Sequence, residues 1–308
     1  MWFKDKFPVV SYLLGKKYLL TRTFFYRKDP VKWTKKTYKK KYGIELDLEN
    51  PKTFYEKMNY WKHFSYLKEQ DLLTDKIEVK NVLEKLGYKD ICAKCFFETT
   101  SIKDFKEWVK ANKDKYQRFV VKTSHSCGDV FIYDNGKITK KYGREIKNLS
   151  KVLRMIRIGL KYNHYYTCFE QNYKDLKPRV FVEEYLELND GAVEYEFMCN
   201  YGKVSFINVV ENRQSKSHRE VLLDKDFNCI EQVSEPLRKN AVFKKPEQMK
   251  LIEEIISKTV SKFPFCRVDF IISNSKLYFC EFTFVKSGGI NLYKPEHLNQ
   301  SLGDLFRL

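Results

Sequence analysis

The chain has 308 residues, 43% of them hydrophobic and 16% aromatic, which suits about two folded domains and excludes a chain that is mainly disordered. No apolar run approaches the ~18 residues that a membrane-spanning helix needs. The net charge of +18 is uneven, because residues 1–41 hold thirteen Lys or Arg and only two Asp, so anionic membranes and nucleic acids are the partners to consider.

Residues 1–46 alternate basic residues with aromatic and aliphatic ones, and we predict that they form a basic N-terminal arm. Three interpretations stay open: a helical outer face of the protein, a peripheral anchor on an anionic membrane through residues 1–41, or a nucleic-acid contact. No DNA- or RNA-binding motif accompanies the basic residues, so we expect no nucleic-acid partner. A truncation that lacks residues 1–41 is expected to keep the chemistry of the remaining chain.

The eight cysteines are scattered along the chain, as in a protein from a reducing compartment. Cys92 and Cys95 form a single C-x-x-C pair, but tetrahedral zinc needs four ligands and no second pair follows. The apolar run after Lys4 and Lys6 is short and lacks the cleavage site of a signal peptide. We therefore predict a cytoplasmic protein, with any membrane contact peripheral and at the inner face.

Residues 47–115 are predicted to form a helical N-terminal domain. One helix is expected to begin after Thr53, because Phe54, Met58 and Trp61 follow at helical spacing. Two further helices are expected, one from about Thr74 to Gly87 and one over residues 104–109 with Ser101 as its cap.

From Phe119 onward the pattern changes to strands. Strands expected over residues 119–122 and 130–133 flank a flexible polar loop over residues 124–129, and Asn135-Gly136 is a strong signal for a hairpin turn. The elements expected after this turn are a strand over 137–139, a helix over 149–160, a strand over 179–186, paired strands over 194–199 and 203–210, a helix over 246–263, and a final hairpin of 265–272 with 277–284.

Two carboxylates stand where a core strand would be apolar, Asp269 in the first strand of the final hairpin and Glu281 in the second. Burying a carboxylate is costly unless a partner compensates its charge. The two face each other if the loop between the strands has an odd number of residues. A two-residue Asn274-Ser275 turn would place them on opposite faces, unless a bulge restores the match.

A cation is the expected partner of two adjacent carboxylates. Mg²⁺ is one candidate, because proteins hold it through one or two carboxylates together with phosphate oxygens. The other candidate is a salt bridge from Arg267, which shares a strand face with Asp269, to Asp269 or to Glu281. On these two strands alone, both interpretations stay open.

Three further features suggest a nucleotide. Lys122 ends a strand before the polar loop, which can cover phosphates with the lysine as a point charge. Glu183-Glu184-Tyr185-Leu186 ends another strand, where backbone groups and Glu183 can bind an adenine edge, and Asp75-Lys76 opens a helix where the lysine would lie near phosphate. Taken singly, a surface lysine or a solvated glutamate explains each feature better.

Taken in chain order, these residues resemble the ATP-grasp superfamily and, in detail, its TupA-like (teichuronopeptide biosynthesis) family. The resemblance runs from about residue 47 to the C-terminus and rests on Asn50-Pro51-Lys52-Thr53-Phe54-x-Glu56-Lys57, Lys177-Pro178-Arg179, Glu183-Glu184-Tyr185-Leu186, Phe197-x-Cys199-x-x-Gly202-Lys203, Phe263-Pro264-Phe265-x-Arg267-Val268-Asp269 and Glu281-Phe282-Thr283-Phe284. It implies an α+β ATP-grasp fold, in which a lid subdomain (116–186) and a catalytic subdomain (187–308) grip ATP between them.

The resemblance also implies the ligands of ATP and Mg²⁺. The phosphates would be held by Lys76, Lys122 and the lid-loop residues Ser126 and Gly128, the adenine by Glu183 and the backbone of Glu184, Tyr185 and Leu186, and the ribose by Glu194, with Glu196 as a competitor. Mg²⁺ would be bound by Asp269 and Glu281, and the reacting acyl phosphate would be stabilised by Arg267, with Arg213 as a second donor. Two departures are that Gly128 is the only glycine of its loop and that Thr283 stands where many ATP-grasp enzymes have a metal-binding Asn.

The implied activity is that of an ATP-dependent carboxylate–amine ligase, which forms an amide through an acyl phosphate. By analogy, the carboxylate and amine substrates would be glycan-linked, with a uronic acid or amino-acid substituent modified during cell-surface polysaccharide biosynthesis. Two alternatives stay open: a glycosyltransferase-like enzyme of the same pathway, which would consume a nucleotide sugar and no ATP, and a non-catalytic protein that binds membranes or polyanions.

Overall fold

A computed structural model describes residues 7–140, 144–146, 148–188, 192–211, 219–232, 245–293 and 295–308. The chain forms two compact units, which we call the lid unit (Met1–Lys28, Asp71–Cys168 and Asn172–Glu187) and the catalytic unit (Asp29–Gln70, Phe169–Gln171 and Leu188–Leu308). The four-domain division expected from the sequence, with boundaries after residues 46, 115 and 186, stays a prediction.

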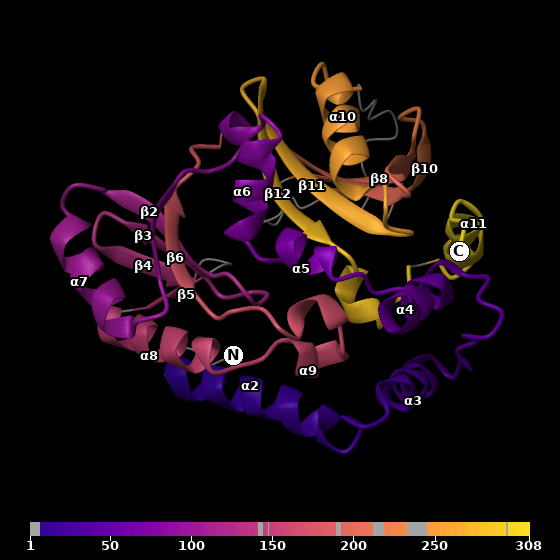
Figure 1. The fold of residues 1–308 in the computed structure, drawn as a ribbon, viewed down its shortest axis with the longest axis horizontal. Helices are drawn as coiled ribbons and strands as arrows, with labels where there is room; N and C mark the ends of the chain where they lie inside the picture. The colour runs from indigo at the N-terminus through magenta and orange to yellow at the C-terminus, as the bar shows by residue number, and fades with distance from the viewer. Residues whose placement is uncertain are drawn as a thin grey trace. The chain divides into compact units, whose positions relative to one another are not determined.

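The lid unit contains a six-stranded antiparallel sheet in the order β1-β6-β2-β3-β4-β5 (Figure 1). Asn135 and Gly136 both have positive φ angles between β3 and β4, which confirms the predicted hairpin turn. The strands are β1 (Cys95–Thr99), β2 (Arg118–Thr123), β3 (Val130–Asp134), β4 (Lys137–Lys140), β5 (Arg144–Glu145) and β6 (Val180–Glu184).

Strand β1 corrects the sequence-based expectation that residues 47–115 are helical. The segment is aromatic, and Phe96 stacks on Tyr116 while Phe97 stacks on Trp108. It pairs with β6, which lies more than eighty positions later in the chain. The partner that makes this short aromatic run a strand is therefore non-local, and no local pattern identifies it.

Helices α7 and α8 cover the apolar face of this sheet. The helix predicted over residues 149–160 is α8 with the same bounds, and Ser101 caps α7 as expected. Their buried side chains, among them Phe105 and Ile156, pack with Val121 and Val182 of the sheet. The helices of this part of the chain are α2 (Pro8–Phe24), α5 (Glu69–Thr74), α6 (Glu78–Lys85), α7 (Ile102–Asn112), α8 (Leu149–Leu160) and α9 (Tyr165–Cys168), with short 3₁₀ turns at Lys89–Ile91 and Gln171–Tyr173.

The polar loop over residues 124–129 is packed rather than flexible as predicted. Ser124, His125, Ser126 and Asp129 are all buried. The Ser126 hydroxyl donates to Oδ2 of Asp129 at 2.7 Å and also contacts the Thr123 hydroxyl. Hydrogen bonds satisfy the hydroxyls of Ser124 and Ser126 and the carboxylate of Asp129, which lowers the cost of burying them.

The catalytic unit contains a second antiparallel sheet of six strands, in the order β10-β9-β8-β7-β11-β12. Helix α10 packs on β8, and the apolar face predicted over 246–263 supplies its buried residues. Strands β9 and β10 were not predicted. The strands are β7 (Val193–Asn200), β8 (Lys203–Glu211), β9 (Arg219–Asp224), β10 (Cys229–Gln232), β11 (Cys266–Ser273) and β12 (Lys276–Thr283).

The remaining helices of this unit surround an aromatic core. Helix α4 begins as predicted after Thr53, which forms a capping box with Glu56. Phe54, fully buried, lies with its ring within 6 Å of the rings of Phe265 and Phe306. The helices are α3 (Pro30–Tyr42), α4 (Phe54–Phe64), α10 (Met249–Val260) and α11 (Leu298–Asp304), with a 3₁₀ turn, η3, at Lys286–Gly289.

The predicted N-terminal arm is divided between the two units. Helix α2 belongs to the lid unit and α3 to the catalytic unit, where Trp33 and Tyr38 are only 2% exposed. Removing residues 1–41 would therefore take core residues out of the catalytic unit, so this truncation is not the clean test that the sequence suggested. Among the described residues, no helix has both the length and the apolarity required to cross a membrane.

Candidate functional site

The final hairpin places Asp269 and Glu281 directly opposite each other. The strands are joined by the two-residue turn Asn274-Ser275, which alone would put the carboxylates on opposite faces. The register shifts after Asp269, so that Phe270 pairs with Phe279 and Cys280 is the extra residue of a bulge. The bulge returns Asp269 and Glu281 to the same face of the sheet. A two-residue turn with a compensating bulge was one of the two geometries considered from the sequence.

The two carboxylates belong to a longer polar row that crosses four strands. Asp269 of β11 pairs with Glu196 of β7, and Glu196 pairs with Asn208 of β8. Asp269, Glu196 and Asn208 are all buried, and the amide of Asn208 donates to Glu196 at 2.8 Å and to Glu220 of β9 at 2.7 Å. Because side chains on neighbouring strands lie side by side, register alone assembles this row.

Arg267 is the cation at the centre of the row. Its Nε and Nη2 donate to the two oxygens of Asp269 at 2.8 and 2.6 Å, and Nη2 also donates to Glu281 at 2.9 Å. The salt-bridge interpretation therefore holds for both carboxylates. Burial and the nearby carboxylates of Glu196 and Glu281 raise the pKa of Asp269, although Arg267 opposes this shift.

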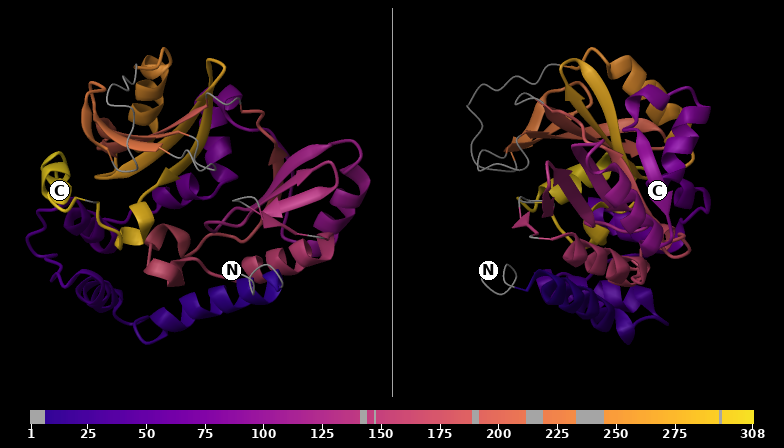
Figure 2. Two further views of the ribbon diagram at one scale, coloured as in Figure 1. Left: turned by 180° about the vertical axis from the view of Figure 1, so that it is seen from behind. Right: turned by 90° about the vertical axis from the view of Figure 1, so that its left-hand side faces the viewer.

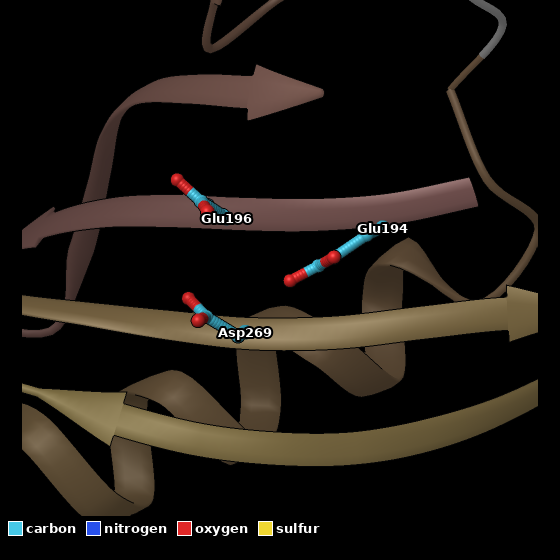
Figure 3. Close-up of side chains that lie close together, drawn as sticks. All are labelled: Glu194, Glu196 and Asp269. Carbon is cyan, nitrogen blue, oxygen red and sulfur yellow. The ribbon is translucent and has the colours of Figure 1, made fainter. Parts of the chain in front are cut away.

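Asp269 also lies in a group of three carboxylates that could hold a metal ion. One oxygen each of Glu194, Glu196 and Asp269 lies within 4.8 Å of the others, and Figure 3 shows the Glu194 side chain reaching along β7 toward the other two. Carboxylate oxygens are hard ligands of the kind that Mg²⁺ prefers, and one or two of these three would suffice together with phosphate oxygens. The structure thus groups Asp269 with the two glutamates of β7, whereas Glu281 is half-exposed and bonded to Arg267.

Glu196 has further partners that the sequence did not identify. Nζ of Lys286 lies 3.2 Å from its Oε2, and Nη1 of Arg267 lies 3.9 Å from its Oε1. Oδ1 of Asn208 and the hydroxyl of Tyr293 are buried close by and have no hydrogen-bond partner among the residues that the structure describes. Unsatisfied polar atoms beside a carboxylate group are the feature that a bound ligand would explain.

The turn after β12 is held in a strained conformation by helix α4. Ser287, Gly288 and Gly289 all have left-handed φ angles, between 53° and 73°. The carbonyl of Gly288 accepts from Nζ of Lys62, and that of Gly289 accepts from the Asn59 amide at 2.7 Å. A Cβ at residue 289 would lie 2.5 Å from Oδ1 of Asn59, so the close approach requires glycine.

In the lid unit, Glu183 forms ion pairs with two lysines. Its carboxylate contacts Lys122, which was predicted only as a phosphate ligand, and Nζ of Lys80 at 2.6 Å, which no sequence-based prediction named. Burial works to raise the pKa of Glu183, but the two lysines outweigh it and hold the pKa below its ordinary value. Lys80 lies on the face of α6 that meets β6, and local sequence gave no sign of this.

Lys76 is bound to the buried loop. Its N–H donates to the carbonyl of Ser124 and its Nζ to that of Ser126 at 2.8 Å. Gly128, with a φ of 81°, lies in the same loop, and a Cβ there would meet no neighbouring atom. The structure therefore brings together the Lys76, Ser126 and Gly128 of the predicted phosphate site, and their role as ligands stays a prediction.

The predicted adenine segment begins inside β6, because Glu183 and Glu184 are the last two residues of that strand. The N–H of Glu184 is already used, because it donates to the carbonyl of Lys94 at 2.9 Å, and the guanidinium of Arg118 lies over the ring of Tyr185. Leu186 follows outside the strand.

In the catalytic unit, Thr283 pairs with Arg267 on the neighbouring strand. Arg213, the predicted second donor, lies outside the described residues.

Comparison with protein families shows the family to which this chain belongs. The family model described as TupA-like ATPgrasp matches residues 56–307, most of the chain. The chain belongs to the TupA-like ATP-grasp family. The α+β ATP-grasp fold expected from the sequence is thereby confirmed, and the two antiparallel sheets with their covering helices are its form in this chain.

Several solved structures are similar to this chain at low identity. The macrocyclase MdnC of Microcystis aeruginosa MRC, bound with its precursor peptide, has 9% identity over 78% of this chain and 62% of its own length, with a TM-score of 0.41. D-alanine–D-alanine ligase of Bacillus anthracis complexed with ATP has 14% identity over 80% and 71%, with a TM-score of 0.42. Cdc123 of Schizosaccharomyces pombe has 13% identity over 79% and 94%, also with 0.42. No curated protein matches the sequence.

Proposed function

We propose that this TupA-like ATP-grasp protein is an ATP-dependent carboxylate–amine ligase. The observation that carries the proposal is the polar row of the catalytic unit, in which Arg267 binds Asp269 beside Glu196 and Glu194. An ATP-dependent ligase needs a cation-binding carboxylate group and a fixed arginine near the transferred phosphoryl group. The row supplies both on adjacent strands of one sheet.

The proposed reaction has two steps. The γ-phosphoryl group of ATP passes to an oxygen of the substrate carboxylate, the bond to the β-phosphate oxygen breaks, and an acyl phosphate and ADP form. An amine then attacks the acyl carbon, phosphate leaves, and the amine loses a proton, so that the products are an amide and inorganic phosphate. Arg267 is proposed to stabilise the charge on the acyl phosphate.

Mg²⁺ fits the donor set of the row, and we propose Asp269 and Glu196 as its protein ligands, with Glu194 or Glu281 completing the set. When bound, Mg²⁺ neutralises charge on the phosphates. In the lid unit, Lys122 and Lys76 are proposed to bind phosphate oxygens, and Glu183 with the backbone of Glu184 and Leu186 to bind adenine. The lysine pair of Glu183 keeps its carboxylate ionised and able to accept a hydrogen bond.

We further propose that the substrates are a uronic acid or an amino-acid substituent and an amine, joined during the assembly of a cell-surface polysaccharide. The family name supports this setting, and it remains an analogy between the family and this chain. The acid and the amine are best identified by offering the protein pairs of each with Mg-ATP and searching the products for an amide by mass.

The Asp269→Asn variant tests the catalytic row. Loss of the charge that binds Arg267 and the metal should lower ADP formation by about 100-fold or more. The matched control is Glu254→Gln, which removes a carboxylate from the exposed face of α10 in the same unit. ADP formation should be measured with Mg-ATP and an acid–amine pair, and circular dichroism should show that both variants are folded.

Three results would contradict parts of the proposal. Undiminished turnover in Asp269→Asn would remove the catalytic role of the row. Turnover of a nucleotide sugar with no ATP consumption would favour the glycosyltransferase-like alternative. A substrate carboxylate labelled with heavy oxygen should pass one label to inorganic phosphate, and unlabelled phosphate would exclude the acyl phosphate.

A further inference from the structure

Helix α2 is attached to the lid unit through polar side chains. The hydroxyl of Tyr12 donates to Oδ1 of Asp129 at 2.6 Å, and Nζ of Lys16 lies 3.2 Å from Oδ2 of the same buried carboxylate. About two turns further on, the buried hydroxyl of Thr23 donates to the carbonyl of Tyr166 at 2.6 Å. These contacts fix which face of α2 points inward.

The close packing of α2 on α8 depends on a glycine. A Cβ at Gly159 would lie 3.0 Å from the Tyr12 hydroxyl and 3.1 Å from Oδ2 of Asp129. Figures 1 and 2 show α2 running beside α8 and α9, with which it makes contact along its length. Helix α2 is therefore an integral part of the lid unit, and these contacts define which of its faces points inward.

The opposite face of α2 is apolar and exposed to solvent. Leu14 is 51% exposed and Phe25 is 87% exposed. Positions three and four apart lie on one face of a helix, and the outward row continues in this spacing. The large hydrophobic residues exposed over α2 and the residue on each side of it are Phe7, Val10, Leu13, Leu14, Tyr18, Phe24 and Phe25. A surface helix normally has the reverse arrangement, with apolar residues inward and polar residues outward.

The charge of this segment has one sign. Between Phe7 and Lys28 there are five basic residues and no acidic one. Lys17, Arg27 and Lys28 are exposed beside the apolar row. An exposed apolar face with aromatic residues and bordering cations is the pattern of helices that lie in the interface of an anionic bilayer.

We propose that the outer face of α2 binds the surface of a membrane that contains anionic phospholipids. The apolar row would enter the boundary between headgroups and acyl chains, and Lys17, Arg27 and Lys28 would contact the lipid phosphates. The sequence-based hypothesis placed a membrane anchor over residues 1–41, and this proposal assigns the contact to the outer face of α2 alone. The lid unit would be held at the membrane with α2 parallel to the bilayer plane.

The test is flotation of the full-length protein with vesicles. The wild type should bind vesicles of phosphatidylcholine and phosphatidylglycerol in equal amounts, bind phosphatidylcholine alone much more weakly, and be released by salt. The double variant Leu14→Glu/Phe25→Glu should bind vesicles at least about tenfold more weakly, because it lacks two apolar side chains that the bilayer would bury in the wild type. The double variant Lys17→Gln/Lys28→Gln should lose the preference for anionic vesicles.

The matched control is Leu72→Glu, which changes a leucine of α5 that is also 51% exposed. This variant should bind vesicles like the wild type. Wild-type binding that is absent, or that Leu14→Glu/Phe25→Glu leaves unchanged, would overturn the proposal. So would concentration-dependent self-association that this variant abolishes in the absence of vesicles, because the face would then join two copies of the chain. Binding is measured without ATP, so its failure is separable from failure of the ligase proposal.

Discussion

At the scale of single residues, the structure shows how buried charges are compensated. Asp269 is bound by Arg267, Glu196 by Lys286 and Asn208, and Glu183 by two lysines. The sequence identified Asp269 because a carboxylate in an apolar strand needs a partner, and Glu183 because it ends a strand where an adenine edge could bind. It did not identify Lys80 or Lys286, since a lysine near an apolar run is equally compatible with an exposed position.

The ion pairs of Glu183 lead to a prediction about stability. Glu183→Gln should lower the free energy of unfolding by about 1–3 kcal/mol, because Lys80 and Lys122 lose the charge that compensates them in a partly desolvated site. Urea unfolding at neutral pH measures the change. The combination of Glu183→Gln with Lys80→Met should recover part of it, and a Glu183→Gln variant as stable as the wild type would show that the pairs contribute nothing.

His125 gives a prediction about pH. Its Nε2 lies 3.1 Å from the carbonyl of Gly159, and its Nδ1 is buried without a hydrogen-bond partner. Burial lowers the pKa of His125, so the folded protein keeps the ring neutral where an unfolded histidine, with a pKa of about 6.5, binds a proton. The unfolded state then binds more protons, and stability falls as the pH falls below about 6.5.

The His125→Gln variant should flatten this dependence, because glutamine can donate to the same carbonyl and does not titrate. The slopes of unfolding free energy against pH should differ by up to about 1.4 kcal/mol per pH unit between pH values of roughly 6 and 5. The measurement is urea unfolding of both proteins across this range. Identical slopes would mean that His125 is protonated in the folded state.

At the scale of elements, local sequence predicted the bounds of helices and hairpins best where capping and turn residues are present. The helix over 149–160 and the Asn135-Gly136 turn were found as expected, and so were the Thr53 and Ser101 caps. Strands β1, β5, β9 and β10 were missed. Their segments become strands because neighbouring strands pair with them, and this pairing is not encoded in any local window.

The capping box of α4 is the basis of an element-scale prediction. Thr53 accepts the N–H of Glu56, and the Glu56 carboxylate accepts the N–H of Thr53. Thr53→Ala should cost about 1 kcal/mol of stability, because it leaves a helix N–H without its partner. Thr37→Ala, within α3, is the control and should be nearly neutral. Thermal unfolding of both variants is the measurement, and equal losses would argue against the cap.

At the scale of the whole molecule, the N-terminal segment belongs to the fold of both units. Helix α2 supplies two partners of Asp129, Tyr12 and Lys16, and α3 supplies Trp33 and Tyr38 to the core of the catalytic unit. The sequence suggested a separable arm, because its charge and apolar residues alternate without a clear core-facing stripe. The inward face of α2 combines Val9 and Tyr12, which pack on the core, with the polar Lys16 and Thr23, so it is no purely apolar stripe.

Deletion of residues 1–28 tests this assignment. It removes Tyr12 and Lys16 and leaves the buried Asp129 without its cation, so the melting temperature should fall by about 5 °C or more. Tyr12→Phe, which removes one hydrogen bond only, should cause a smaller fall. The outer-face variant Leu14→Glu should have the melting temperature of the wild type. A deletion variant with an unchanged melting temperature would show that α2 does not stabilise the fold.

The sequence by itself determined the elements with strong local signals, the α+β class, the two carboxylates of the final hairpin and the resemblance to the TupA-like family. Those features depend on residues close together in the chain, whose periodicity and turn chemistry are read directly. Only the tertiary structure decided that a bulge at Cys280 aligns Asp269 with Glu281, that Glu196 lies beside Asp269, and that the apolar face of α2 points outward. Each of these depends on register or docking between segments far apart in the chain, and a shift of one residue would reverse every side chain on a strand.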